Sequence, residues 1–418
     1  FLAMSDSEYL CPGQRHPISR AVHLGRLAAF YPPCRACPHR HDVGASSPRQ
    51  QEQRRELEAS GPPVSVFDAE GLSGALGDPL TPELVRCVAA AFAVETQASR
   101  AENEGIKGPT LLLLAGDGRA ATAELMAAAC EGLRWNDCDV IDLGATTSAG
   151  LAMAVAQFAA AGGLYLGNAE FEPHRASVRF WTPGPSPISV GPLLDRIRRR
   201  ADAGAERTSR TSGSVSRASA EATYWPSVAE HYHALRPLRI VIDSASGPWL
   251  DGLQRLAAIV ACQIVPCRAS RGDLSRQVRA TESHLGLCVD GDGERCVVWD
   301  QRGRPVPTER LLTLLARELS SQGEAAVVVE ASAPSAMIRA LERLGVRVTV
   351  AESARAAMSA AMFEHSALLG GGPSGRFWHS LAGVPLPDAL MTLTRLFVAL
   401  SRGDEPFSVV LDREAPLG

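Results

Sequence analysis

The chain has 418 residues, of which 45% are hydrophobic and 21% charged, and its formal net charge at pH 7 is −4. This composition is close to that of an average globular protein and excludes a wholly disordered chain, a collagen-like fibre and a coiled coil. The sequence has no apolar stretch of about 18 residues that would span a bilayer, and its net charge predicts no general affinity for nucleic acid. The first residues lack the basic-then-apolar pattern of a secretory signal, so we expect a cytoplasmic protein.

Paired cysteine and histidine residues characterise the first 45 residues. A Cys-x2-Cys pair follows a helix predicted over residues 20–31, and a cysteine and a histidine precede it. A tetrahedral zinc ion takes four such ligands, two from each element. We therefore predict a zinc-ribbon-like module over residues 1–45 with structural Zn²⁺, the alternative being a metal-free pair of thiols. The predicted ligands are Cys11, His16, Cys34 and Cys37, with His39 or His41 as alternatives for the fourth position.

Behind this module, apolar runs of strand length alternate with segments of helical periodicity. We predict a linker over 46–63, then α/β units over 64–202, 224–323 and 324–418, with a mobile Ser/Arg-rich connection over 203–223. Three successive series of this kind predict three α/β/α domains with mostly parallel, buried strands. The predicted strands cover 110–115, 140–143, 164–166, 238–243, 285–289, 325–332 and 346–352, and the predicted helices cover 122–135, 150–161, 249–261 and 334–345.

An acidic loop follows the strand predicted over 285–289. Its carboxylates Asp290, Asp292 and Glu294 alternate with glycines, so they can converge on one hard divalent cation. Arg295 can then orient a phosphate or balance the charge. The alternative is an ordinary solvated acidic turn.

Several motifs share their order and spacing with one enzyme family. The segments are FDAEGLSG at 67–74, LTPEL at 80–84, GDGR at 116–119, GG at 162–163, DGDGER at 290–295 and GGGPSGR at 370–376. In this order the chain resembles the alpha-D-phosphohexomutase superfamily, the phosphoglucomutase and phosphomannomutase enzymes. The resemblance implies the three α/β/α domains of that family.

In this family a phosphoserine exchanges its phosphoryl group with a sugar phosphate, beside a magnesium ion on three aspartates. Positioning and electrostatics carry most of the catalysis of phosphoryl transfer. The resemblance implies a sugar-phosphate ligand and a magnesium site at Asp290, Asp292 and Glu294. The residues implied in substrate binding are Arg119, Arg295, Ser374 and Arg376.

Several positions depart from the family pattern. Ala169 stands where the phosphoserine is expected, and Glu170 and Glu172 add negative charge beside it. Glu294 replaces the third aspartate, and Gly372 replaces a glutamate that contacts sugar hydroxyls. The chain stops at Gly418, where the family continues into a fourth domain. We therefore expect a relative without mutase turnover and with no assigned catalytic residue, which binds a sugar phosphate or acts as a scaffold for a protein partner.

Two alternatives come from other functional classes. One is an active sugar-phosphate enzyme, a mutase or another activity, that uses Glu170 or Glu172 in place of a serine. The other is nucleic-acid binding through the mildly basic zinc module, which would be strongly weakened by salt.

Overall fold

The computed structural model describes residues 9–10, 16–28, 37–39, 42, 66–105, 110–168, 174–204, 211–232, 235–244, 246–260, 262–267, 271–321, 323 and 325–413. The chain divides into an N-terminal unit, Phe1–Ser65, and a large unit, Val66–Gly418. Within the described residues, no helix has the length and apolar character needed to cross a membrane.

The N-terminal unit is built around helix α1 (Arg20–Ala28). The helix begins where the sequence predicts, and the Ser19 hydroxyl accepts a hydrogen bond from the Val22 N–H at 3.4 Å. The Tyr9 ring stacks on the buried His23 ring with centroids 4.1 Å apart, and the Tyr9 hydroxyl donates to Asp42. A few aromatic and polar contacts therefore hold the described part of this unit.

The large unit begins with a seven-stranded sheet in the order β1-β2-β6-β5-β3-β4-β7. Strands β5, β3, β4 and β7 run parallel, whereas β6, β2 and β1 are added as antiparallel pairs. The strands are β1 (Phe67–Asp68), β2 (Gly71–Ala75), β3 (Thr110–Gly116), β4 (Cys138–Ala145), β5 (Gly162–Gly167), β6 (Arg175–Trp181) and β7 (Val215–Arg217). Strand β7 lies inside the stretch predicted as a mobile connection, so that part of the prediction is wrong.

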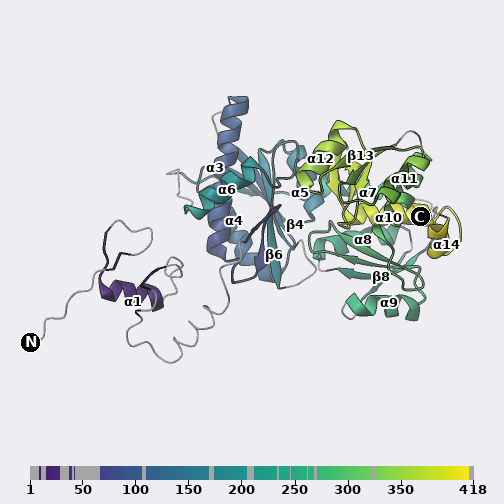
Figure 1. Ribbon diagram of the computed structural model, residues 1–418, viewed down its shortest axis with the longest axis horizontal. Coiled ribbons are helices and arrows are strands. Elements are labelled where there is room, and N and C mark those ends of the chain that lie inside the picture. Colours follow the sequence, from purple (N-terminus) through teal and green to yellow (C-terminus); the bar gives the residue numbers. More distant parts are fainter. Residues whose placement is uncertain are drawn as a thin grey trace, which may run out of the picture. The chain divides into compact units, whose positions relative to one another are not determined.

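Helices cover both faces of this sheet. Leu112 and Leu114 of β3 join one apolar cluster with the α3, α4 and α6 side chains, whereas Leu113 and Ala115 join another with α5 and α7. Alternate residues of a strand face opposite sides, which is why β3 reads as one continuous apolar run. Figure 1 shows α3, α4 and α6 gathered on their side of the sheet. The helices are α3 (Pro82–Glu104), α4 (Ala123–Arg134), α5 (Ser148–Gln157), α6 (Pro192–Asp202) and α7 (Glu221–Ala229), with a 3₁₀ turn at Ala120–Thr122.

Two smaller sheets follow, in the orders β11-β10-β8-β9 and β13-β12-β14-β15-β16. Each repeats the plan of the first sheet, with parallel strands towards one edge and antiparallel strands towards the other. The strands are β8 (Arg239–Ser244), β9 (Gln263–Pro266), β10 (Leu285–Val289), β11 (Cys296–Asp300), β12 (Ala326–Glu330), β13 (Arg347–Ala351), β14 (Leu369–Gly371), β15 (Phe377–Leu381) and β16 (Val384–Pro387). The helices are α8 (Gly247–Ile259), α9 (Arg271–Ala280), α10 (Thr308–Ser320), α11 (Ser335–Arg343), α12 (Arg355–Glu364), α13 (Ala389–Leu400) and α14 (Phe407–Asp412).

Local signals fix several helix ends. The Thr81 hydroxyl accepts from the Leu84 N–H at 3.2 Å, Pro82 opens α3, and Gly105 ends it with a φ of 66°. Asp388 caps α13 through the N–H groups of Leu390 and Met391. The predicted three-fold α/β organisation is thus present as three sheets, and the predicted strands and helices agree with the observed ones to within a few residues.

Candidate functional site: a buried charge cluster where the three sheets meet

The loops that follow β5 and β10 touch each other. A Cβ on Gly291 would lie 2.6 Å from the Cβ of Asn168, and a Cβ on Gly167 would collide with Asp292 Oδ1. Only glycine permits this close approach. The end of β5, immediately before Ala169, therefore lies against the acidic loop, as the family pattern predicts. Residues 169–173, which include Ala169, Glu170 and Glu172, are outside the described residues.

The acidic loop is buried rather than solvated. Asp290, Asp292 and Glu294 each expose at most 2% of their surface, which contradicts the alternative of a solvated turn. Asp290 Oδ1 accepts the Glu294 N–H at 2.8 Å and so closes the turn, with Gly293 at a φ of 76°. Asp292 Oδ2 accepts from the Ser177 hydroxyl at 3.4 Å, and its buried Oδ1 has no hydrogen-bond partner.

Burial also governs the protonation of the two aspartates. Burial and then the charge of Glu294 raise the pKa of Asp290 to about 7. The pKa of Asp292 rises well above its usual value through burial and the neighbouring charges of Asp290 and Glu294. Carboxylates that share a dry site disfavour each other's ionisation.

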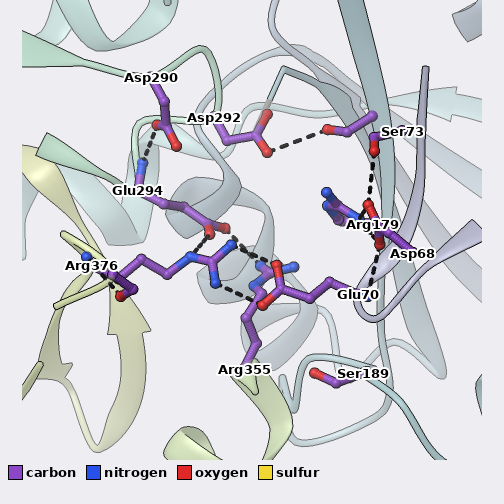
Figure 2. A network of polar contacts seen from close by, with 12 residues as sticks. Asp68, Glu70, Ser73, Arg179, Ser189, Asp290, Asp292, Glu294, Arg355 and Arg376 are labelled. Carbon is purple, nitrogen blue, oxygen red and sulfur yellow. Dashed lines mark hydrogen bonds and ion pairs between the residues drawn. The ribbon is translucent and has the colours of Figure 1, made fainter. Parts of the chain in front are cut away.

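Glu294 faces away from these aspartates and binds two arginines (Figure 2). Its Oε1 accepts from Arg355 Nη2 at 2.6 Å, and its Oε2 lies 3.3 Å from Arg376 Nε. The Arg355 guanidinium also stacks over the Trp181 ring at 4.6 Å. Both carboxylate oxygens of Glu294 are therefore in contact with cationic side chains.

The turn between β1 and β2 contributes a second set of charges to the same cluster. Glu70 accepts two hydrogen bonds from Arg376, at 2.6 and 2.5 Å, in a fork-like pair. Burial by itself would raise the pKa of Glu70, but the charges of Arg376 and Arg355 lower it to about 2. Arg179 holds both oxygens of Asp68 at 2.7 and 2.9 Å.

The two arginines on Glu294 differ in their charge balance. Burial lowers the pKa of Arg355, whose Nε and Nη1 are buried without hydrogen-bond partners. Arg376 is also buried, yet the carboxylates of Glu70 and Glu294 raise its pKa. The difference follows from their contacts, because Arg376 touches two carboxylates and Arg355 touches one.

The acidic loop fits a divalent cation poorly. Among the described residues, no group of three His, Cys, Asp or Glu side chains is placed to hold a metal ion. The unpartnered Asp292 Oδ1 is a suitable oxygen ligand, but the third carboxylate, Glu294, is taken by Arg355 and Arg376. Mg²⁺ requires oxygen ligands in strict octahedral geometry, so the predicted magnesium site at Asp290, Asp292 and Glu294 is not formed in this arrangement.

The loop over 370–376 carries Ser374 as predicted, and a carboxylate from another element lies against it. The Ser374 N–H donates to Glu330 Oε2 at 3.0 Å, and its hydroxyl donates to Glu330 Oε1. A Cβ on Gly372 would lie 2.7 Å from the same Glu330 carboxylate. Glu330, at the end of β12, therefore fills the space that a side chain at position 372 would need.

Two further predicted binding residues lie outside the cluster's ion pairs. Arg119 Nε pairs with Asp117 at 2.5 Å, and its Nη2 donates to the Arg175 carbonyl at 2.9 Å. Arg295 forms a backbone bridge with Arg376, and its buried Nε has no hydrogen-bond partner. Arg376 itself is bound to Glu70 and Glu294, which leaves it less available to a substrate than predicted.

The zinc prediction falls largely on residues that the structure does not describe. Cys11, Cys34 and His41 lie outside the described residues. Of the others, Cys37 is 1% exposed, His16 is exposed, and the His39 ring meets the Tyr9 ring edge-on at 5.4 Å. The described residues include no metal-binding group in this unit either.

The sequence did not predict which charged residues lie against the acidic loop. Asp68 and Glu70 stand in the FDAEGLSG segment, whose place near the cluster was foreseeable from the motif order. Arg179, Glu330 and Arg355 stand outside the quoted motifs and carry no local signal. Only the tertiary structure brings Arg355, at the start of α12, to Glu294.

This cluster joins three successive α/β sheets, the arrangement that the resemblance to the phosphohexomutases implies. Residues 64–189 match the family model for phosphoglucomutase/phosphomannomutase, alpha/beta/alpha domain I. The chain is 23% identical over 360 residues to the phosphomannomutase/phosphoglucomutase of Pseudomonas aeruginosa, which covers 81% of this chain and 75% of that protein. The predicted resemblance to the alpha-D-phosphohexomutase superfamily is therefore confirmed.

Solved structures share the fold. A phosphoglucomutase/phosphomannomutase family protein from Burkholderia thailandensis superposes with a TM-score of 0.72 at 23% identity, over 84% of this chain and 79% of that one. The Aspergillus fumigatus N-acetylphosphoglucosamine mutase, solved in complex with GlcNAc-6P and magnesium, has a TM-score of 0.52 at 12% identity over 88% and 83% of the two chains. At these identities the likeness concerns the fold.

Proposed function

We propose that this phosphohexomutase-like protein binds a hexose phosphate at the junction of its three sheets and does not turn it over through a phosphoserine. The observation that carries the proposal is the chemistry of position 169. Residue 169 directly follows Asn168, which touches the acidic loop at Gly291. An alanine methyl group cannot carry a phosphoryl group, whereas the transfer that the resemblance implies passes through a serine hydroxyl at this position.

The ligand class follows from the relatives and from the loops that surround the cluster. The Aspergillus fumigatus relative binds GlcNAc-6P. In this chain, the buried Arg376 and Ser374, which is held by Glu330, lie in the segment 370–376, where the resemblance implies substrate contacts. Guanidinium groups suit phosphate oxygens, and serine hydroxyls suit sugar hydroxyls. Arg119, Arg295, Ser374 and Arg376 are the proposed contacts.

Binding and turnover are tested separately. Isothermal titration with glucose 1-phosphate, glucose 6-phosphate and GlcNAc-6P should give saturable heats, and inorganic phosphate at the same concentration serves as control. A coupled assay with magnesium and glucose 1,6-bisphosphate should then show no interconversion of hexose phosphates. Ser374→Ala should weaken the binding of sugar phosphates more than that of phosphate.

Two results would refute the proposal. If none of the sugar phosphates binds, the proposed ligand class is wrong, and the alternative of a scaffold protein is favoured. Turnover that persists, or a phosphoenzyme trapped with labelled bisphosphate, would show an active mutase. In that case the matched variants Glu170→Gln and Glu172→Gln would report whether a carboxylate replaces the missing serine.

We also propose that the N-terminal unit binds structural Zn²⁺ through Cys11, His16, Cys34 and Cys37, with His39 or His41 as alternatives to His16. The spacing of the pairs and the burial of Cys37 support this. The unit is too small to bury much apolar surface, so a bound metal would provide much of its stability.

A further inference from the structure

The third carboxylate of the acidic loop is paired with two buried arginines. Glu294 contacts Arg355 Nη2 at 2.6 Å and Arg376 Nε at 3.3 Å. The side chains of all three residues are at most 4% exposed. Charge pairs this close and this dry interact far more strongly than exposed pairs, because little solvent screens them.

A cation in this loop would have to compete with those arginines. For Glu294 to coordinate a metal, its carboxylate would have to leave two buried guanidinium groups that then lack their partner. Breaking a buried ion pair in this way is strongly unfavourable. Asp290 and Asp292 alone supply too few protein oxygens to replace that loss for an ion as reluctant to lose water as Mg²⁺.

The cluster also connects elements that are remote in the chain. Glu70 lies in the turn between β1 and β2, Glu294 follows β10, and Arg376 immediately precedes β15. Arg376 binds both of these carboxylates, one on the first sheet and one beside the second. Figure 2 shows its side chain between Glu70 and Glu294, with Arg355 on the same carboxylate of Glu294.

We propose that Arg355 and Arg376 balance the charge of the acidic loop in place of a divalent cation, and that with Glu70 and Glu294 they form a metal-independent clamp between the three sheets. The clamp does not depend on sugar-phosphate binding or on mutase turnover. It distinguishes this chain from the magnesium-bearing arrangement that its family predicts.

The first test titrates the wild-type protein with Mn²⁺, a paramagnetic probe of magnesium sites, and follows free Mn²⁺ by electron paramagnetic resonance. We expect no saturable Mn²⁺ site tighter than millimolar in the acidic loop, and the same thermal midpoint of the large unit with and without added Mg²⁺ at equal ionic strength, with no chelator present. Saturable binding at about one ion per chain that is lost in Asp290→Asn would overturn it. Sugar phosphate is absent throughout, so the outcome is separate from that of the proposed function.

The second test removes the arginines together, as Arg355→Gln/Arg376→Gln. Freed from its partners, Glu294 can turn to the aspartates, so the double variant should gain a Mn²⁺ site at least tenfold tighter than any in the wild type. Arg255→Gln is the matched control, because Arg255 pairs with Glu221 and both side chains are exposed. If the double variant is folded, as verified by circular dichroism, and still binds no Mn²⁺, the arginines do not stand in place of a divalent cation and the proposal is overturned. If the double variant does not fold, the wild-type titration decides.

Discussion

The described parts of the N-terminal unit and of the large unit differ in how deeply their paired polar side chains are buried. In the described part of the N-terminal unit, Tyr9 and His23 stack on each other and pair with Asp42, which is 40% exposed. In the large unit, which has an extended apolar core, Glu294, Arg355 and Arg376 are almost fully buried.

The difference shows what a large core permits. Moving charges out of water is expensive, and only a domain with much buried apolar surface can offset that cost. The large unit can therefore bury Glu294, Arg355 and Arg376 as ion pairs. A unit as small as the first lacks that reserve and needs another source of stability, for which its paired cysteines are suited.

The largest expected effect is the removal of the proposed zinc from the N-terminal unit. Structural zinc contributes about 10–16 kcal/mol in small zinc modules, so a strong chelator should unfold this unit and leave the large unit folded. Metal analysis of full-length protein and its amide NMR spectrum before and after chelation measure both effects. Cys37→Ser should lose the metal, whereas Cys87→Ser, in α3 of the large unit, should keep it. Protein made in zinc-containing medium that carries no zinc would contradict the prediction.

Next in size is the loss of the clamp. Arg376→Met leaves Glu70 and Glu294 buried without their shared partner, which should destabilise the large unit by about 3–5 kcal/mol. Urea unfolding of wild type and variant measures this difference. Arg255→Met, which breaks the exposed pair with Glu221, should cost less than about 1 kcal/mol. Equal effects of the two substitutions would mean that burial does not set the strength of the clamp.

Acid should weaken the same clamp. The pKa of Glu70 falls from 4.5 to about 2 on folding, so its ionised form stabilises the folded state above pH 4.5, and this contribution is lost as pH falls towards 2. Glu70→Gln has no such titration, so the wild type's advantage of about 3 kcal/mol near neutral pH should shrink over that range. Urea midpoints between pH 7 and pH 2.5 test this. A difference between the two proteins that does not change with pH would contradict the assignment.

The smallest effect concerns the aromatic contact of the N-terminal unit. Tyr9→Phe keeps the ring stack but removes the hydroxyl bond to Asp42, at a small cost because Asp42 is exposed to solvent. Hydrogen exchange should report this as faster local opening of the N-terminal unit alone. Tyr165→Phe removes a buried hydroxyl bond to the Thr146 carbonyl in the large unit, and its effect should appear there instead.

The sequence by itself determined the α/β organisation, because buried parallel strands must be continuous apolar runs and these runs are visible in the chain. It also located the acidic loop beside the loop of position 169 through motif order, and it established that residue 169 has no side-chain oxygen. Only the tertiary structure decided how the charges pair. Glu70 and Arg376 are 306 positions apart. The sequence does not indicate which of the 42 lysine and arginine residues pairs with which of the 46 acidic residues. Ion pairing depends on distance and burial, and folding alone sets both.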